Sequence, residues 1–408
     1  MGAKLSSGVG STRVPRLAVV AYTEYPSDPR VRREAESLVE AGYLVHAIAL
    51  RPRDGRSPAH VGGVHLHEVP LSVRRGGKLR YAYQYLMFFL LSTIVLARLH
   101  SHRPFDLVHV HSLPDFQAFC GLPVRMTGGA VLLDLHEAMP EILASRFRIP
   151  ASSVWVRLAA FLERVSCEFA NHVIVANDGI RAALLARGLN ADHVTAVYNP
   201  GDGAGPIPKP EEIARALRVP HGPLIVHAGG INPERDLETL FRAVAQLPAD
   251  SGVNVIVAGD GDPSYVRELG QLADRLGLGS RVLFVGNVSR EEALSLMSLA
   301  TIGVVTLKAN PLTELAWPSR IAEFARLRKP LVVPRLRFVA ETLADGARYY
   351  RPGDADSLAA ELHAALVGLG SRESSIAKAD AICSRFDWSR MRPVLMSIYK
   401  ALEGPSAS

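Results

Sequence analysis

Short runs of consecutive aliphatic residues alternate with longer amphipathic runs along most of the chain. Six apolar runs fall in the first half, at 16–22, 44–50, 107–111, 130–136, 172–177 and 194–199. Nearly continuous apolar strands separated by helical segments are typical of a parallel sheet that helices cover on both faces. The pattern therefore predicts a doubly wound α/β domain in this half of the chain.

The same alternation resumes after the stretch "NPGDGAGPIPKP" (199–210), which is dense in glycine and proline. Further strands are expected at 223–230, 253–258, 281–287, 301–307 and 330–335, with helices between them and a last helix near 354–368. At the end of the chain, residues 388, 391, 394, 395, 398, 399 and 402 are apolar at helical spacing. We expect this tail to bury its apolar stripe against the first half.

These patterns divide the chain into five segments. We expect a flexible polar leader at 1–15, an N-terminal domain at 16–198, a linker region at 199–222, a C-terminal domain at 223–384 and a C-terminal helix at 385–408 that crosses back to the first domain. Two such domains facing one another leave a cleft outside the carboxyl ends of their strands, where ligands usually bind.

Composition narrows the class of protein. The chain has 408 residues, of which 48% are hydrophobic and 21% charged, as in globular proteins with more than one core. Its net charge of +6 suits anionic ligands or an anionic membrane surface, and we expect no nucleic-acid partner. The three cysteines are widely spaced and no secretory signal is evident, which indicates a cytoplasmic location.

The segment "RRGGKLRYAYQYLMFFLLSTIVLARLHSHR" (74–103) has an apolar centre with basic flanks. Its central stretch, 81–97, would reach only about 25 Å as a helix, less than the roughly 30 Å of bilayer hydrocarbon. The pattern favours a buried domain helix or a helix on a membrane surface over a transmembrane span. The basic flank of Arg74, Arg75, Lys78 and Arg80 would suit anionic headgroups.

Two motifs in the second half are candidates for binding an anion. In "WPSRIAEF", Ser319 and Arg320 begin a predicted helix whose free N–H groups attract phosphate, and Glu323 has the chemistry to hold a ribose diol. The simpler interpretation is a surface ion pair between residues one turn apart. In "HAGGINPERD", Gly229 and Gly230 permit close backbone approach and Arg235 can reach a phosphate, although a plain strand-to-helix turn has the same pattern.

In the first half, "LLDLHEAMPE" places Asp134, His136 and Glu137 at the end of a predicted strand. His136 is a candidate for a hydrogen bond to a substrate hydroxyl, or a structural histidine. His109 and His111 alternate along another strand, and one of them is a further candidate to face the cleft. We do not expect them to bind metal, because no third ligand follows at a suitable spacing.

The motif "SDPRVRREA" puts Asp28 and Arg30 at the start of a helix, where an anion could bind. Capping of that helix by Ser27 or Asp28 is the structural alternative. No strand is followed by a complete G-x-G-x-x-G or P-loop motif, which argues against a dehydrogenase or an NTPase.

Taken together and in order, these motifs resemble retaining glycosyltransferases of the GT-B type, in particular family 4. The matching segments are "DPRVRREAESLVEAGYLV", "FDLVHVHSLPD", "LLDLHEAMPE", "VTAVYNPGD", "GGINPERDLETLFRA", "VIVAGDGD", "RVLFVGNV", "WPSRIAEFARLRKPLVV" and "FDWSRMRPVLMSIYKAL". The resemblance implies two Rossmann-like domains facing across a cleft, with the donor bound by the second and the acceptor mainly by the first.

The resemblance also implies roles for individual residues. The catalytic set is His136 near the transferred sugar, Arg235 and Arg320 at the diphosphate, and Glu323, the second glutamate of an E-x7-E pattern, at the ribose. The donor set is Gly229, Gly230, Gly286, Asn287, Val288, Glu314 and Ser319, with 286–288 reading the base. The acceptor set is Asp28, Arg30, His111 and Glu137. Leu315 stands where the first glutamate belongs, with Glu314 as the adjacent substitute, and Gly230 stands where an arginine is usual.

The implied reaction is hexosyl transfer from a nucleotide sugar without a cofactor or metal, because arginines and a helix N-terminus neutralise the leaving diphosphate. The acceptor hydroxyl would attack on the face from which the diphosphate departs. We expect a lipid-linked or small-molecule acceptor, and a place in cell-envelope polysaccharide or glycolipid synthesis at the inner face of the membrane. A soluble natural-product acceptor, a GT-B epimerase or phosphorylase, and a non-catalytic accessory protein are the alternatives.

Overall fold

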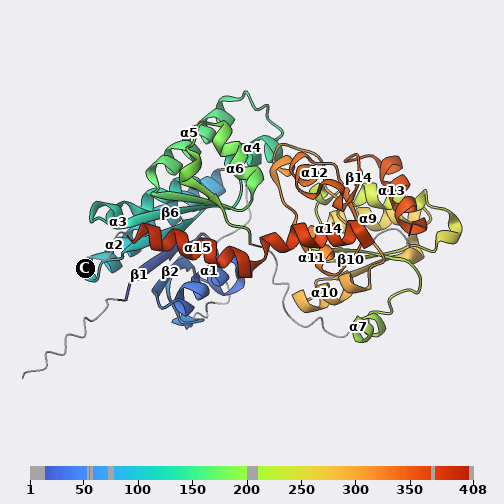
Figure 1. Ribbon diagram of the computed structural model, residues 1–408, viewed down its shortest axis with the longest axis horizontal. Coiled ribbons are helices and arrows are strands. Elements are labelled where there is room, and N and C mark those ends of the chain that lie inside the picture. Colours follow the sequence, from blue (N-terminus) through green and yellow to red (C-terminus); the bar gives the residue numbers. More distant parts are fainter. Residues whose placement is uncertain are drawn as a thin grey trace, which may run out of the picture.

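The computed structural model describes residues 14–52, 55, 58–71, 78–199, 210–368 and 373–403, and two lobes make up its length (Figure 1). Nearly all of the predicted leader, and residues 200–209 of the predicted linker, lie outside the described residues. The remainder of that linker includes a helix, α7 (Pro210–Ala216). Both lobes are built on parallel sheets flanked by helices, so the predicted α/β class is confirmed.

The first lobe contains one eight-stranded sheet in the order β3-β4-β2-β1-β5-β6-β7-β8. Its parallel strands are β1 (Arg16–Val20), β2 (Leu44–Leu50), β4 (Val64–Val69), β5 (Leu107–His111), β6 (Ala130–Leu135), β7 (His172–Val175) and β8 (Val194–Ala196), with β3 (His60–Val61) antiparallel at the edge. The sequence prediction missed β3 and β4, because alternating histidines interrupt the aliphatic pattern there.

Helices cover both faces of this sheet, and a separate apolar cluster fills each side. They are α1 (Pro29–Glu40), α2 (Lys78–His102), α3 (Leu122–Met126), α4 (Met139–Phe147), α5 (Val154–Phe169) and α6 (Asp178–Ala186), with the 3-10 helix η2 (Asp115–Gly121) between α2 and α3. The α1 N-terminus illustrates the local causes: Asp28 accepts hydrogen bonds from two first-turn N–H groups, and Pro29 begins the helix.

Helix α2 accounts for the apolar segment 74–103. Five residues at four-residue spacing face inward and are buried: Gln84, Phe88, Ser92, Leu96 and His100. Among the described residues this is the one helix that is long and apolar enough to cross a membrane, over Arg80–His102 with a mean hydropathy of 1.5. Because Phe88 and Leu96 belong to the core of the first lobe, α2 is a domain helix on that face. Arg74 and Arg75 lie outside the described residues.

The second lobe has two three-stranded parallel sheets, β11-β10-β9 and β12-β13-β14. The strands are β9 (Leu224–Ala228), β10 (Asn254–Ala258), β11 (Val282–Gly286), β12 (Gly303–Val304), β13 (Leu331–Pro334) and β14 (Arg348–Tyr350). A parallel bridge between Ile225 and Ile302 connects the sheets into one layer. The flanking helices are α8 (Leu237–Ala245), α9 (Pro263–Arg275), α10 (Arg290–Leu299), α11 (Ser319–Arg326), α12 (Arg337–Leu343), α13 (Ala355–Val367) and α14 (Glu373–Cys383).

The last helix, α15 (Trp388–Leu402), returns to the first lobe and lies beside α1 (Figure 1). Leu395, Ile398 and Tyr399 are buried in the same cluster as residues of β1, β2 and α1. The Trp388 indole N–H donates to Ser37 Oγ over 3.3 Å. The apolar stripe recognised in the tail is thus part of a core in the other lobe.

Candidate functional site

A cavity of about 470 Å³ lies between the two lobes. The first lobe supplies Arg30, His136, Glu137, Ala176, Asn177, Ile180, Tyr198 and Asn199 to its wall. Most of the remaining wall comes from the ends of β9 and β12 and from the loop and helix after β12, including His227–Gly230, Glu234, Arg235, Val304–Leu307 and Leu312–Arg320 apart from Glu314. Three arginines and two glutamates line the cavity, so it favours a polar anionic ligand.

The N-terminus of α11 opens on this cavity. Pro318 is the N-cap and forms no side-chain cap, and no side chain of the described residues is hydrogen-bonded to the first-turn N–H groups of this helix. Ser319 and Arg320, the first two helical residues, both line the cavity. Unsatisfied N–H groups, the positive end of the helix dipole and a guanidinium together form an anion site.

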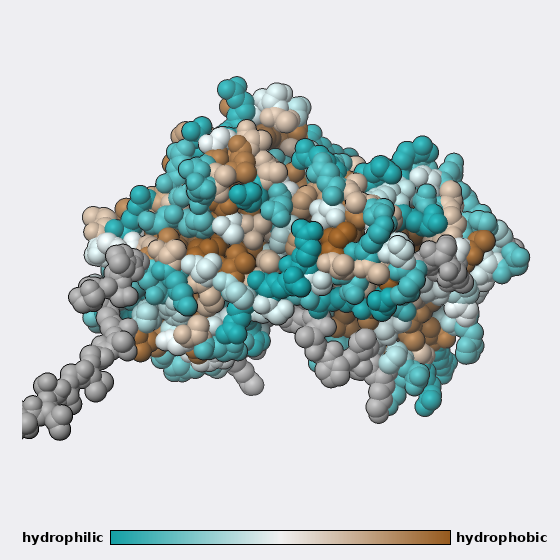
Figure 2. Space-filling model, in the orientation of Figure 1, coloured by the Kyte–Doolittle hydropathy of each residue, from teal (hydrophilic) through white to brown (hydrophobic). Residues whose placement is uncertain are grey.

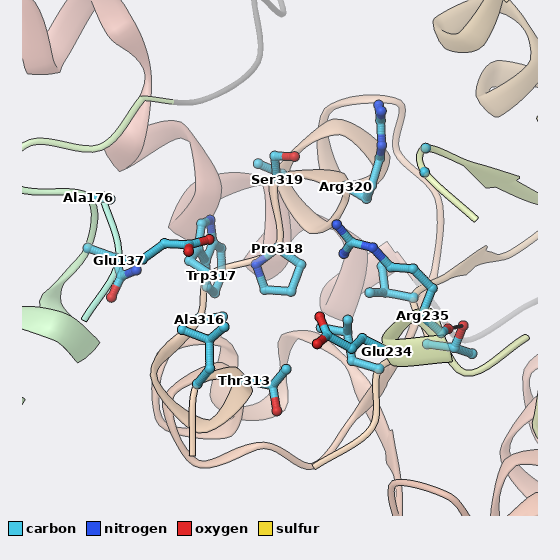
Figure 3. A pocket seen from close by; sticks show the side chains of 18 of the residues that line it. Glu137, Ala176, Glu234, Arg235, Thr313, Ala316, Trp317, Pro318, Ser319 and Arg320 are labelled. Carbon is cyan, nitrogen blue, oxygen red and sulfur yellow. Dashed lines mark hydrogen bonds between the residues drawn. The ribbon is translucent and has the colours of Figure 1, made fainter. Parts of the chain in front are cut away.

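Arg235 reaches the same part of the cavity from a different loop. It ends the 3-10 helix η4 (Pro233–Arg235), which Asn232 holds in place by accepting hydrogen bonds from the N–H groups of Glu234 and Arg235 at 3.1 and 3.3 Å. Its guanidinium forms no ion pair within the described residues and points toward Pro318 and Arg320 in Figure 3. Burial and the nearby Arg320 charge lower the pKa of Arg235, as expected for two cations facing one anion site.

Gly229 and Gly230 also line the cavity, where the ends of β9 and β10 come very close. A Cβ on Gly259, which has φ +151°, would lie 1.8 Å from the carbonyl oxygen of Gly229. Only glycine fits at this position. The bare backbone at the end of β9 is therefore exposed to a ligand.

Glu323, to which the resemblance assigns the ribose, lies outside the cavity wall. Its side chain is buried on the inner face of α11, where it pairs with Arg320 and lies 3.8 Å from Arg290 Nη2. The structure thus contains the i,i+3 ion pair between Arg320 and Glu323 that was the simpler interpretation of this motif. In this arrangement Glu323 orients Arg320.

Two further sets of predicted donor residues lie outside the cavity wall. The Glu314 carboxylate accepts a 2.7 Å hydrogen bond from the Arg337 N–H at the start of α12. Its neighbour Leu315 lines the cavity and packs into the first lobe's core. Gly286, Asn287 and Val288 follow the end of β11 outside the cavity wall, with Gly286 and Asn287 exposed.

On the first-lobe side, His136 follows β6 and is held from behind by Asp134. The His136 Nε2–H donates to Asp134 Oδ2 over 2.9 Å, and His111 Nδ1 lies 3.0 Å from both His136 Nε2 and the same carboxylate oxygen. Burial lowers the pKa of His136, although Asp134 opposes the shift, so a neutral imidazole with an accepting Nδ1 is expected. Burial alone would raise the pKa of Asp134, but His136 and His111 hold it well below its usual range.

Of the other residues predicted to bind the acceptor, two line the cavity and two do not. Arg30 and Glu137 line the cavity, and burial raises the pKa of Glu137. His111 is buried behind His136 and does not line the cavity. Asp28 does not line it either, because its carboxylate caps α1 by accepting from Arg30 N and Val31 N at 3.1 and 3.2 Å. The capping alternative for Asp28 is the one that the structure contains.

The sequence analysis missed an aromatic wall where the lobes meet. The Tyr198 and Phe386 rings stack at 4.0 Å, and Trp317 meets Phe386 edge-on at 5.4 Å. All three residues line the cavity, although they come from the end of the first lobe, the α11 loop and the segment before α15. Their only sequence signal is an aromatic residue in each of three segments that connect longer elements, which no periodicity distinguishes.

Comparison with known proteins gives the family. Residues 27–200 match the glycosyl transferase 4-like domain, and residues 209–380 match glycosyl transferases group 1. The sulfoquinovosyl transferase SQD2 of Arabidopsis thaliana is 22% identical over 310 residues, which are 73% of this chain and 57% of that protein. The chain thus aligns with little more than half the length of this curated relative.

Solved structures share the fold. A sucrose-phosphate synthase from Thermosynechococcus elongatus superposes with a TM-score of 0.76 at 18% identity, over 95% of this chain and 99% of that one. HepE of Anabaena in complex with UDP gives 0.72 at 19% identity, over 95% and 100%, and HepE has also been solved with UDP-glucose. With the two domain matches in order along nearly the whole chain, the protein belongs to the group 1 glycosyltransferases, with a glycosyl transferase 4-like first domain and the GT-B fold.

Proposed function

We propose that this protein transfers a sugar, with retention of anomeric configuration, from a nucleoside diphosphate sugar to an acceptor hydroxyl at a membrane surface. The product would be a cell-envelope polysaccharide or glycolipid made at the cytoplasmic face. One observation carries the proposal: Arg235, at the end of η4, and Arg320, in the first turn of α11, meet at a helix N-terminus whose N-cap residue forms no side-chain cap, across the cavity from His136. The family assignment and the nucleotide-bound fold relatives support it.

In this proposal the diphosphate lies between Arg235, Arg320 and the first turn of α11. Arg235 is free of ion pairs within the described part of the chain, so its charge is available to the ligand. Arg320 is oriented by Glu323 without losing its access to the cavity. Positioned donors of this kind stabilise the charge that develops on the leaving diphosphate, each by about 2.7–4 kcal/mol.

The acceptor would approach from the first lobe. His136 presents an accepting Nδ1 to a sugar hydroxyl, and Arg30 and Glu137 lie beside it on the same wall. We assign no enzyme nucleophile: the acceptor oxygen bonds to the anomeric carbon as the bond to diphosphate breaks on the same face, and a diphosphate oxygen takes the hydroxyl proton. The neutralising charge comes from the arginines and the helix, and no metal is required in this scheme.

The membrane part of the proposal rests on an apolar face of the first lobe, defined by outward residues of α2, α3 and α5. They are Tyr83, Leu86, Leu90 and Ile94 of α2, Leu122 and Met126 of α3, and Val154, Trp155, Leu158, Phe161 and Leu162 of α5. Trp155 is 65% exposed and Phe161 60%. The ring contacts of Phe89 with Phe116 and of Phe119 with Phe169 occupy the space between α2 and α5.

The chemistry around the apolar face selects a lipid surface as its occupant. Arg80, Arg98, Arg125, Arg157 and Arg164 on the same helices are exposed. Apolar side chains with surrounding arginines fit a bilayer that carries anionic headgroups. In Figure 2 hydrophobic side chains are visible over α5 at the top of the first lobe.

The donor half of the proposal is tested by thermal unfolding with UDP, GDP, ADP, CMP and dTDP sugars, starting with UDP-glucose. A ligand at 100 times its Kd stabilises the protein by about 2.7 kcal/mol. We expect one base to stabilise the native protein and Arg242→Ala, an exposed arginine of α8, but not Arg320→Ala. With the donor known, NMR of the product sets the anomeric configuration. Failure of every nucleotide sugar to stabilise the native protein would favour the accessory-protein alternative.

The membrane half is tested by cosedimentation with vesicles of phosphatidylglycerol and phosphatidylcholine. We expect binding that the double variant Trp155→Ser with Phe161→Ser loses. The control is Val367→Ser, which removes an apolar side chain 72% exposed on the second lobe. If the native protein does not bind such vesicles but still binds a nucleotide sugar, the soluble-acceptor alternative is the better one.

A further inference from the structure

Four buried ionisable side chains converge inside the first lobe, behind the cavity wall. They are Glu34 of α1, His109 and His111 of β5, and Asp134 of β6. One ligand atom from each lies within 4.8 Å of every other. From the sequence, His109 and His111 had no third partner at metal-binding spacing. The fold supplies two carboxylates from segments 75 residues upstream and 25 residues downstream of His109.

Three of these side chains each bring into the cluster a polar atom that forms no hydrogen bond. Glu34 Oε2, His109 Nε2 and His111 Nε2 have no hydrogen-bond partner among the described residues. The Glu34 side chain is 3% exposed, His109 0% and His111 2%. The distance of 3.9 Å between Glu34 Oε2 and His109 Nε2 is too long for a hydrogen bond. Buried polar atoms without partners are rare and costly, so this cluster requires an explanation.

The other ring nitrogen of each histidine is already engaged. His111 Nδ1 lies 3.0 Å from His136 Nε2 and 3.0 Å from Asp134 Oδ2, whereas its Nε2 has no partner among the described residues. His109 Nδ1 is 2.6 Å from the hydroxyl oxygen of Tyr399 in α15. Histidines that bind metal through one nitrogen usually donate the other N–H to a carboxylate, a carbonyl or another acceptor. The His109 ring, through Tyr399, therefore has the outer contact of a metal ligand.

We propose that Glu34, His109, His111 and Asp134 form a structural site for a divalent first-row transition metal, best suited to Zn²⁺. Imidazole nitrogens and carboxylate oxygens are ligands that zinc accepts in a closed tetrahedral site. Two carboxylates balance a dication, so the buried site would be neutral as a whole. This site lies behind the cavity wall, away from the diphosphate position, and it shares Asp134 with the hydrogen bond that holds His136.

The fit requires a modest contraction. Ligand atoms around tetrahedral zinc lie about 3.4 Å apart, given bonds of roughly 2.1 Å, so pairs that are now up to 4.8 Å apart must close by up to about 1.4 Å. Rotation of the Glu34 and Asp134 carboxylates supplies such a shift. The bound ion would tie together α1, β5 and β6, and through Tyr399 the docking point of α15.

The test measures metal in the full-length chain, produced without a polyhistidine tag and dialysed against EDTA. Mass spectrometry of the elements should find about one zinc ion per chain, because a buried structural site exchanges slowly. Glu34→Gln and His109→Asn should reduce this to below about one-tenth. The control is His65→Asn, because His60 and His65 form an exposed pair at 2.8 Å that is able to bind metal adventitiously.

A second measurement does not depend on the variants folding. Unfolding the native protein in guanidinium with a colorimetric chelator should release about one equivalent of zinc, and little before unfolding. Cobalt introduced during refolding should give the visible absorption of a tetrahedral site. The proposal is wrong if the native chain, refolded with zinc or cobalt, retains neither. It is also wrong if His65→Asn removes the metal while Glu34→Gln keeps it.

Discussion

The two walls of the cavity are built in different ways. The second-lobe wall presents charge, with Arg235 and Arg320 on a turn and a helix start, and bare backbone at Gly229 and Gly230. The first-lobe wall presents His136, which a buried carboxylate holds from behind through hydrogen bonds. The difference indicates that one wall neutralises a leaving group and the other orients an acceptor. Changes to each should then have separable effects.

The largest expected effect is on the charged wall. Arg235→Ala should lower kcat/KM by about a thousandfold, or about 4 kcal/mol, because it removes a positioned cation from the leaving group. Initial rates with the donor identified by thermal unfolding measure this. Arg242→Ala, on the exposed face of α8, is the control. A fully active Arg235→Ala variant would show that the second-lobe wall does not carry the charge neutralisation.

The next effect concerns the aromatic contact that joins the walls. Phe386→Ala should lower the free energy of unfolding by about 3 kcal/mol, because it empties the space between Tyr198 and Trp317. Urea unfolding measures it, with the exposed Val367→Ala as the control. Loss of less than about 1 kcal/mol would mean that the walls are not tied together here.

One histidine on each wall, His227 and His136, allows the two walls to be compared through the pH dependence of stability. Burial and the Arg235 charge lower the pKa of His227 to about 4, so the folded protein binds fewer protons than the unfolded chain as pH falls below about 6.5. Stability from this residue is therefore complete above pH 6.5 and is lost toward pH 4, by about 2 kcal/mol between pH 7 and 5. On the other wall Asp134 opposes the shift of His136.

Urea unfolding at pH 7 and pH 5 tests this difference. His227→Asn should lose less stability between the two pH values than the native protein does, and His136→Asn should change that loss less. The exposed His363→Asn should unfold as the native protein does. Equal behaviour of the His227 and His136 variants would remove the electrostatic contrast between the walls.

The smallest expected effect separates capping from acceptor binding. Asp28→Ala should cost about 1 kcal/mol of stability, because the first turn of α1 loses its cap, and should leave the KM for acceptor unchanged. Arg30→Ala, two residues later and on the cavity wall, should raise that KM. If Asp28→Ala raises it by as much, Asp28 belongs to the acceptor site after all.

Much of the fold was predictable because its strands are buried on both faces. The runs 44–50 and 107–111 correspond to β2 and β5 residue for residue. Strand β4 was not predictable in this way, because its sequence "VHLHEV" carries histidines at alternate positions near the sheet edge. In the second lobe β12 has only two residues, because the chain leaves the ladder where it begins to line the cavity.

For the site, the sequence identified the turns that contribute to the cavity more reliably than it identified the individual side chains that face the ligand. Ser319 and Arg320 do line the cavity, but Glu323, one turn later, is on the buried face of α11. The position of a residue in a motif does not determine which face of its helix packs on the core, because that core forms from segments that are distant in the sequence. The meeting of Tyr198, Trp317 and Phe386 likewise depends on contacts between distant parts of the chain, which no local pattern encodes.

The return of α15 has a consequence for biosynthesis. Leu395 and Tyr399 fill the interior of a lobe whose strands and other helices are all made before residue 200. A ribosome therefore completes an entire second domain before it delivers the residues that finish the first. Until then one face of the earlier domain exposes an apolar groove in the shape of its own last helix, and this nascent surface is where chaperones would bind.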